Sequence, residues 1–176
     1  QTGRNADSVQ IEPNSTKTVA EIKGPGVISH IWVTISCEDT DYLRKLLLRA
    51  YWDGETEPSI DTPVGDFFGV GHGWVTSYQC APFNTSAHET KYGGNAAMNC
   101  WFAMPFQKSA RFEMVNDCDV PVRAFYFYID YQAHPSLDES PYFHAKWKRD
   151  NPCDGWTGEG SVWASAEWQQ RMGSDD

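Results

Sequence analysis

The sequence is poor in basic side chains. Its 176 residues include 14 Lys and Arg against 24 Asp and Glu, which gives a formal net charge of −10. Nucleic-acid binding generally needs a basic face that contacts phosphates, so the charge balance argues against nucleic acid as a partner. The sequence also has no run of 18 apolar residues and therefore predicts no membrane span.

The usual motifs of metal, nucleotide and acyl-transfer chemistry are missing as well. The five Cys form no CxxC pair or zinc-spaced Cys/His cluster, and the five His include no HExxH pair. The glycine-rich residues 69–73 lack the phosphate-loop pattern, and no GxSxG elbow occurs. We therefore expect no cofactor and no metal site. The odd number of Cys leaves at least one thiol unpaired within a monomer.

Aromatic side chains, by contrast, are abundant. The chain has 9 Phe, 8 Trp and 8 Tyr, and 40% of its residues are hydrophobic. This composition supplies much core or stacking surface and is typical of a globular protein. The length favours one domain. We place that domain at residues 1–152 and treat the turn-rich residues 153–176 as a C-terminal extension.

Short strand-like segments separated by turn signals dominate the pattern. The β-branched and aromatic residues mark six segments: residues 17–22, 26–35, 46–52, 98–106, 110–116 and 123–131. Turn signals include residues 24–26 and the Asp53-Gly54 pair, which suits positive φ angles. The predicted fold class is all-β, a jelly-roll β-sandwich with little helix. The helical candidates are one or two turns within residues 39–48 and a loosely amphipathic segment at 161–172.

Residues 123–131 form the most informative predicted strand. Two-residue alternation separates a face that we assign to the core from an amphipathic face. The core face carries Phe125, Phe127, Ile129 and Tyr131, and the other carries Ala124, Tyr126, Tyr128 and Asp130. Two aromatic rows suit a strand that is covered on both sides, either by a second sheet or by another subunit.

Carboxylates are the most abundant chemical resource of the sequence. Glycoside hydrolysis usually needs two carboxyl groups, and Asp61 and Asp66 could flank a pocket. The alternative is that Asp61 is a solvated hairpin residue and that Asp66 caps a turn. Sequence spacing does not fix the distance between the two, so both interpretations stay open.

Two further groups of residues suit a polar ligand. Glycines flank His72 and permit close ligand approach, whereas His30 suits a hydrogen-bonded position within a strand. Asn99 and Trp101 combine hydrogen bonding with an aromatic face, as a sugar site requires. Core packing is the alternative for Trp101.

Several long segments resemble one family. They are, in order, "TGRNAD", "GPGVISHIWVTI", "LLLRAYWDGETEPSIDTPVGDFFG", "NCWFAMPFQKSARFEMVND" and "YFYIDYQ" followed by "YFHAKWKRDNP". These segments are similar to the first half of the DUF2961 proteins, which form glycoside hydrolase family 172. The resemblance covers roughly residues 2–152.

The resemblance implies a fold, an activity and a missing part. Members of the family have two jelly rolls in one longer chain, assemble as trimers or hexamers, and hydrolyse α-D-fructofuranosides or α-D-arabinofuranosides with retention. Their two catalytic glutamates lie in the second jelly roll, the latter in a stretch that resembles Gly-Thr-Gly-Thr-Glu-Asp-Tyr. No such stretch occurs in these 176 residues, so no catalytic residue is assigned.

Two functional interpretations follow. In the first, the chain is the first jelly roll of a furanoside-acting glycoside hydrolase and is seen as a fragment or as half of a split protein. In the second, it is a non-catalytic structural or carbohydrate-binding jelly roll that self-assembles. In either case we expect a homo-oligomer. For the sugar site we select Asp66, His72, Asn99 and Trp101, with Asn5 and Asp7 supporting its rim.

The expected location is extracellular or periplasmic. Two glycosylation sequons, at Asn14 and Asn84, fit this expectation. The sequence begins at Gln1 without the pattern of a secretory leader, and we expect that any leader has been removed.

Overall fold

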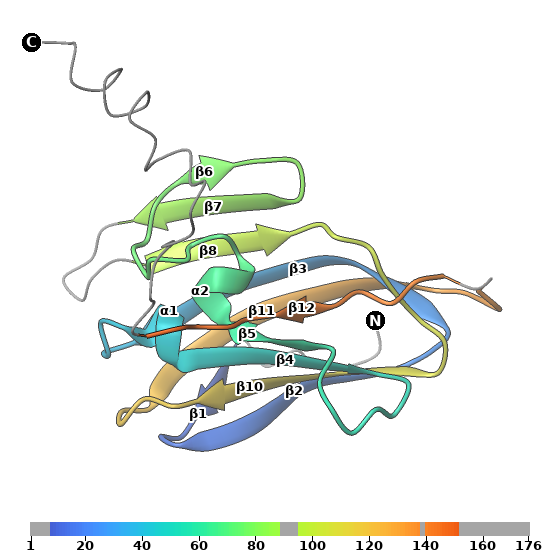
Figure 1. Ribbon diagram of the computed structural model, residues 1–176, viewed down its shortest axis with the longest axis horizontal. Coiled ribbons are helices and arrows are strands. Elements are labelled where there is room, and N and C mark those ends of the chain that lie inside the picture. Colours follow the sequence, from blue (N-terminus) through green and yellow to red (C-terminus); the bar gives the residue numbers. More distant parts are fainter. Residues whose placement is uncertain (1–7, 89–94, 138–139, 152–176) are drawn as a thin grey trace, which may run out of the picture.

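The computed structural model describes residues 8–88, 95–137 and 140–151, which form two packed β-sheets (Figure 1). The larger sheet contains, in spatial order, β1 (Val9–Ile11), β11 (Val122–Ala133), β3 (Gly26–Cys37), β8 (Asn95–Cys100), β7 (Phe83–His88) and β6 (Tyr78–Gln79), and β9 (Met104–Phe106) also pairs with β3. The smaller sheet contains, in spatial order, β12 (Ala145–Lys146), β5 (Ile60–Pro63), β4 (Leu46–Trp52), β10 (Ser109–Asn116) and β2 (Ser15–Lys23).

The fold class predicted from the sequence is confirmed. Along the chain, β2, β4 and β10 lie in the smaller sheet, and β3, β8 and β11 lie in the larger one, so the long strands alternate between the sheets. Such alternation is typical of jelly-roll connections. The boundary between the domain and the predicted extension at residues 153–176 stays a prediction, because the extension and the helical candidate at 161–172 lie outside the described residues.

Two single-turn helices lie at one end of the sandwich (Figure 1). They are α1 (Tyr42–Lys45), which confirms the predicted helical turn within residues 39–48, and α2 (Val64–Phe67). The helices pack closely because Gly65 has no side chain: a Cβ atom there would lie 2.9 Å from Leu43 Cβ and 3.0 Å from the Val70 carbonyl oxygen. This close approach brings the side chain after Gly65 beside α1.

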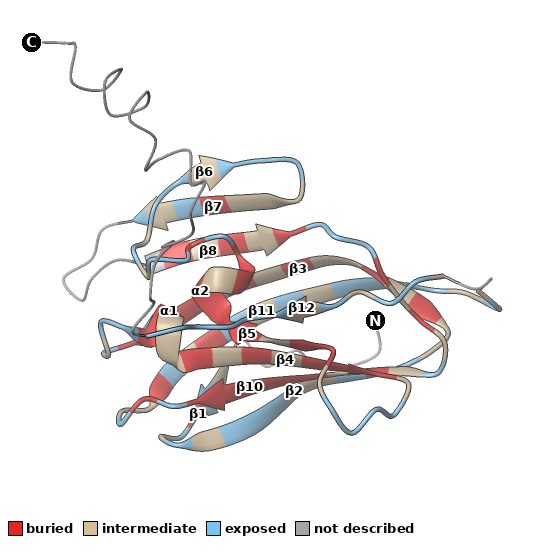
Figure 2. Cartoon of the chain, in the orientation of Figure 1, coloured by how far each residue is buried: buried red, intermediate tan, exposed pale blue. Residues whose placement is uncertain are grey.

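The hydrophobic core lies between the sheets. Its largest fully buried side chains are Trp52, Phe68, Phe106, Phe112 and Phe125. Burial of each such side chain contributes roughly 1.5–3 kcal/mol. Figure 2 shows buried residues concentrated along β4 and β10, whereas the edge strand β2 is largely exposed. No helix among the described residues is long and apolar enough to cross a membrane.

The predicted turn at Asp53-Gly54 is present. Asp53 has a φ angle of 54° and Gly54 one of 87°, and the Glu55 N–H donates to the Trp52 carbonyl. The Asp53 carboxylate accepts from the backbone N–H groups of residues 107–109 and from the Tyr142 hydroxyl. Burial alone would raise the pKa of Asp53, but these hydrogen bonds outweigh it and lower the pKa below its ordinary value. Asp53 therefore links the turn after β4 to residues 107–109 and to the segment that contains Tyr142.

The prediction of one continuous strand at residues 98–106 is wrong. The segment is divided into β8 and β9, which both pair with β3 and are separated by residues 101–103. At the break, the Trp101 N–H donates to the Pro82 carbonyl instead of continuing the ladder with β3. Trp101 is 45% exposed, so core packing, the alternative considered for it, is wrong.

The two faces of β11 follow the predicted alternation over most of the strand. Phe125 is buried, and Phe127 and Ile129 pack partly buried against the core. Tyr131 was expected to join them, but it is 47% exposed, because the register with β3 shifts between Asp130 and Tyr131 and turns the side chain outward. Within the described residues, no second sheet covers the opposite face.

Candidate functional site

A row of hydrogen-bonded polar side chains crosses the outer face of the larger sheet. We name Asp130, His30, Asn99 and Asn84 the polar row; they come from β11, β3, β8 and β7, which are consecutive neighbours in the sheet. His30 Nδ1 lies 2.9 Å from an Asp130 carboxylate oxygen, and His30 Nε2 lies 3.0 Å from Asn99 Oδ1. Asn99 Nδ2 donates to Asn84 Oδ1 at 3.4 Å. The imidazole is thus held in one orientation by partners on both sides.

Strand alternation explains why these side chains reach the outer face. Asn99 lies between Met98 and Cys100, which are both fully buried, so its own side chain points away from the core. The register pairs His30 with Asp130 and Asn99 with Asn84. The row therefore depends on strand pairing between positions far apart in the sequence.

An aromatic ring covers one side of the row. The Trp101 ring stacks on the His30 ring, with 5.2 Å between centroids and an angle of 13° between planes. Trp101 reaches this position because β8 ends at Cys100. Further along β3 and β11, Trp32 packs against Tyr128 with 5.2 Å between ring centroids. Polar groups and aromatic faces are therefore adjacent on one exposed surface.

The polar row keeps hydrogen-bonding capacity for a ligand. The Asp130 side chain is 62% exposed, and in the structure only one of its two carboxylate oxygens is bonded to His30. A carboxylate accepts several hydrogen bonds, and an Asn amide both donates and accepts. The row can thus bind hydroxyl groups while the Trp101 ring offers an apolar face to the carbon skeleton beside them.

Asp66, a second predicted site residue, lies in a different setting. Arg44 Nη1 donates to both oxygens of Asp66 at 2.8 Å and also to the Gly71 carbonyl. The Arg44 guanidinium carbon lies 5.3 Å from the centre of the Trp147 ring. We name Arg44, Asp66 and Trp147 the arginine clasp. It joins α1, α2 and the segment after β12, and the Asp66 side chain is only 16% exposed.

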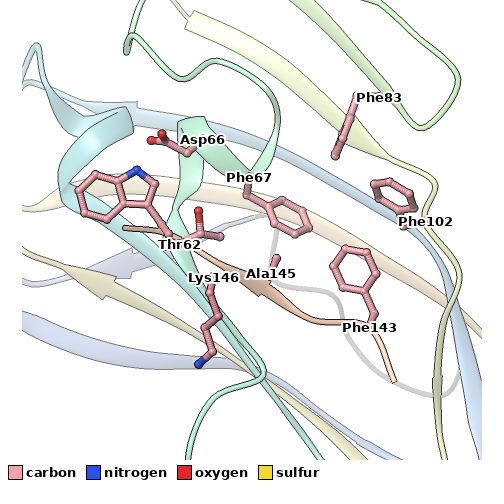
Figure 3. A pocket seen from close by; sticks show the side chains of 9 residues that line it. Thr62, Asp66, Phe67, Phe83, Phe102, Phe143, Ala145 and Lys146 are labelled. Carbon is pink, nitrogen blue, oxygen red and sulfur yellow. The ribbon is translucent and has the colours of Figure 1, made fainter. Parts of the chain in front are cut away.

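An aromatic hollow of about 400 Å³ adjoins the clasp (Figure 3). Figure 3 shows Asp66 and Thr62 on one side of it and Phe83, Phe102 and Phe143 on the other. The Lys146 side chain points away from these phenylalanines and donates to the Pro58 carbonyl. The Asp66 carboxylate is thus held by Arg44 at the wall of a largely apolar hollow.

The structure divides the predicted sugar site. Asn99 and Trp101 lie together with His30, whereas Asp66 belongs to the clasp, and the exposed His72 follows Gly71 beside it. Asn5 and Asp7 lie outside the described residues. The role of all six residues in sugar binding stays a prediction.

The carboxylate pair considered from the sequence, Asp61 and Asp66, is engaged by two arginines. Asp61 accepts from Arg49 at 3.0 Å, and Asp66 accepts from Arg44. Each of the two carboxylates is therefore paired with its own arginine. Among the described residues, no group of three or more His, Cys, Asp and Glu side chains is arranged to hold a metal ion.

Sequence reasoning missed two members of the row. The alternation assigns Asp130 to the amphipathic face of its strand but does not link it to His30, and the sequence marks Asn84 only as part of a sequon. His30 was expected to be a hydrogen-bonded strand residue, and this is confirmed. The alternation of residues 123–131 indicated which face Asp130 occupies. The pairing of Asp130 with His30 follows only from the register between β11 and β3.

One comparison with known proteins identifies a family. A family model described as GH172 domain-like matches residues 1–126, which include His30, Asn84, Asn99 and Trp101. The chain matches no curated protein. The family match covers most of the chain and agrees with the two-sheet sandwich and with the resemblance seen in the sequence. The chain therefore belongs to the GH172 domain-like family and is a relative of its glycoside hydrolases.

Proposed function

We propose that this chain is the carbohydrate-binding jelly roll of a furanoside-acting glycoside hydrolase, and that the polar row with Trp101 contacts the sugar. The observation that carries the proposal is the stacked Trp101 and His30 pair beside the exposed carboxylate of Asp130. The substrate class is an α-D-fructofuranoside or an α-D-arabinofuranoside, as the resemblance to the family implies.

The chemistry of a furanoside matches this surface. The sugar has several hydroxyl groups that donate and accept hydrogen bonds, and its ring also has apolar C–H faces. Asp130 and Asn99 can bond the hydroxyls, and the half-exposed Trp101 ring can pack against the C–H face. A small number of polar groups beside an aromatic wall is typical of a small-molecule site.

Catalysis needs residues that this chain does not supply. Retaining hydrolysis requires a nucleophile and an acid/base carboxyl group about 5–5.5 Å apart. In the family these are glutamates of a second jelly roll, so we expect turnover only when that jelly roll is present. In this proposal, the chain binds and orients the sugar, and the second jelly roll cleaves the glycosidic bond.

Binding of methyl α-D-arabinofuranoside and methyl α-D-fructofuranoside tests the proposal. We expect saturable binding of one of them to the chain by titration calorimetry, and a loss of about tenfold in affinity for Trp101→Ala. Trp74→Ala is the matched control, because Trp74 is 82% exposed. Equal affinities of the Trp101→Ala and wild-type proteins, with both proteins folded, would refute the assignment of this surface.

A specific observation favours a second candidate function, self-assembly of a structural jelly roll. Tyr126, Tyr128 and Tyr131 of β11 are 38%, 50% and 47% exposed. Exposed aromatic side chains clustered on one strand are typical of an interaction surface. We propose a homo-oligomer in an extracellular or periplasmic location. Native mass spectrometry should detect it, and Tyr128→Ser should shift the population toward monomers if β11 forms the contact.

A further inference from the structure

Two buried cysteines, Cys37 and Cys118, lie at the end of the sandwich that carries the β10–β11 turn. Cys37 is the last residue of β3, and its Cα partner across the ladder is Val122, the first residue of β11. Cys118 lies in the turn just before β11, and its N–H donates to Asn116 Oδ1. The turn is held beside the end of β3, because the Asp117 N–H donates to the Lys45 carbonyl and Lys45 pairs with Asp39, two residues after Cys37.

Both side chains are shielded from solvent, and Cys37 lies near enough to Cys118 to raise the pKa of its thiol. Cys118 is fully buried and Cys37 is 8% exposed, and both are free thiols in this structure. The charged groups that face them are Asp39 and Lys45, which pair with each other at 2.7 Å. Cys80, by contrast, is exposed, and Cys100 is buried within β8.

We propose that Cys37 and Cys118 form an intramolecular disulfide when the chain folds in an oxidising environment. One thiolate attacks a disulfide oxidant such as oxidised glutathione, which forms a mixed disulfide and releases one glutathione thiolate. The second cysteine thiolate then attacks the sulfur of the first and releases the other glutathione. The two cysteines lose two protons and two electrons in total, and oxidised glutathione takes them up as two thiols.

The surroundings indicate when this step occurs. Burial, and after it the neighbouring Cys37 and Asp39, raise the pKa of the Cys118 thiol to about 12, so very little thiolate is present in the folded protein. Disulfide exchange requires a thiolate that the oxidant can reach. Oxidation therefore takes place during folding, before the turn closes over β3. Once formed, the disulfide is protected from reductants by the same burial.

The disulfide would hold together segments far apart in the sequence. It would join the end of β3 to the β10–β11 turn and close a loop that contains most of the sandwich. In chain-entropy terms, closing a long loop stabilises the native state by limiting the unfolded chain. For a chain of this size, we expect the midpoint of thermal unfolding to be about 5–15 °C higher in the oxidised protein than in the reduced one.

Peptide mapping of the refolded full chain tests the proposal. The reduced, denatured protein is refolded in a buffer of oxidised and reduced glutathione, blocked with an alkylating reagent and digested with trypsin without reduction. We expect the peptides of residues 24–44 and 112–123, which contain Cys37 and Cys118, to be recovered linked to each other and without alkylation at these two sites.

Two variants separate this pair from other cysteines. Cys80→Ser should leave the linked peptides unchanged, whereas Cys118→Ser should abolish them and lower the unfolding midpoint of the protein to that of the reduced wild type. Recovery of Cys37 and Cys118 as separately alkylated peptides from folded wild-type protein would overturn the proposal. Linkage of either residue to Cys80 or Cys153 would overturn it as well. Because the mapping uses wild-type protein, it remains decisive even if Cys118→Ser does not fold.

Discussion

The polar row and the arginine clasp contain similar groups in opposite situations. Each combines a carboxylate, a nitrogen-containing partner and a tryptophan: Asp130, His30 and Trp101 in the row, and Asp66, Arg44 and Trp147 in the clasp. Asp130 is 62% exposed and its carboxylate has a single partner among the described residues, His30, whereas Asp66 is 16% exposed and both of its oxygens accept from Arg44.

In the proposed function, this difference separates a surface available to a ligand from an element that stabilises the fold. The clasp lies where two helices and the segment after β12 converge, so its hydrogen bonds and ring contact act between parts of the same chain. The row lies on the outer face of a sheet, where a hydroxylated ligand can complete its hydrogen bonds. Chemical type alone did not distinguish the two, since Asp66 and Trp101 were selected for one site from the sequence.

The largest expected effect is the loss of the clasp carboxylate. Asp66→Ala leaves Arg44, only 31% exposed, without its carboxylate partner, and should lower the free energy of unfolding by about 2 kcal/mol. Furanoside affinity of the folded variant should stay unchanged. Chemical denaturation with urea and titration calorimetry measure the two quantities. If Asp66→Ala reduced affinity without reducing stability, the assignments of the clasp and the row would have to be exchanged.

Removal of the stacked ring should have the next largest effect, and it should fall on binding. Trp101→Ala removes an exposed apolar face, so furanoside affinity should fall by about tenfold, equivalent to about 1.4 kcal/mol. Trp147→Ala, which removes the clasp ring, is the corresponding control and should mainly lower stability. Comparable losses of affinity in the two variants would show that the comparison between the regions is wrong.

A third carboxylate, Asp53, extends the comparison to pH. Its pKa in the folded protein is lowered from 3.8, so its contribution is present above that unfolded value and is lost as the pH falls through the lower folded value. Asp53→Asn keeps a residue that tolerates positive φ but removes the charge. We expect a loss of about 1 kcal/mol at pH 7 and a shallower decline in stability below pH 4. Urea titrations at several pH values measure this; parallel pH profiles for the variant and the wild type would contradict it.

The smallest effect on stability is expected at the row itself. Asp130→Asn can still bond His30 but loses a charged acceptor at an exposed position, so the free energy of unfolding should change by less than about 0.5 kcal/mol. Furanoside affinity should fall several-fold, because an amide is a weaker acceptor than a carboxylate. Asp119→Asn, at another exposed aspartate, is the control. A large loss of stability in Asp130→Asn would make the row a structural element like the clasp.

The fold class was predictable from local patterns, and the site was predictable only in part. Segments rich in β-branched and aromatic residues identified β2, β3, β4, β10 and β11, and the Asp53-Gly54 pair identified a turn. The break between β8 and β9 was missed because residues 101–103 are bounded by strand-like segments; it shows in the separate pairing of β8 and β9 with β3 and in the hydrogen bond from Trp101 to Pro82.

The sequence could not assemble the row. Asn99 and Trp101 were recognised by residue type, but His30 and Asp130 are 100 positions apart, and their contact depends on the register between β3 and β11. Asp66 was assigned to the same site because its neighbours suit a pocket. Its partner Arg44 lies on another helix, and it is the packing at Gly65 that brings the two together.

The side-chain amide resonances of Asn99 and Asn84 offer the most direct test of the proposed sugar site. They can be followed by NMR while methyl α-D-arabinofuranoside or methyl α-D-fructofuranoside is added to the isotope-labelled chain. The account predicts that both resonances shift with a common saturation curve, together with the indole signal of Trp101, while the indole signal of Trp147 stays in place. Saturable shifts confined to Trp147 and the aromatic hollow, with the row unchanged, would contradict it.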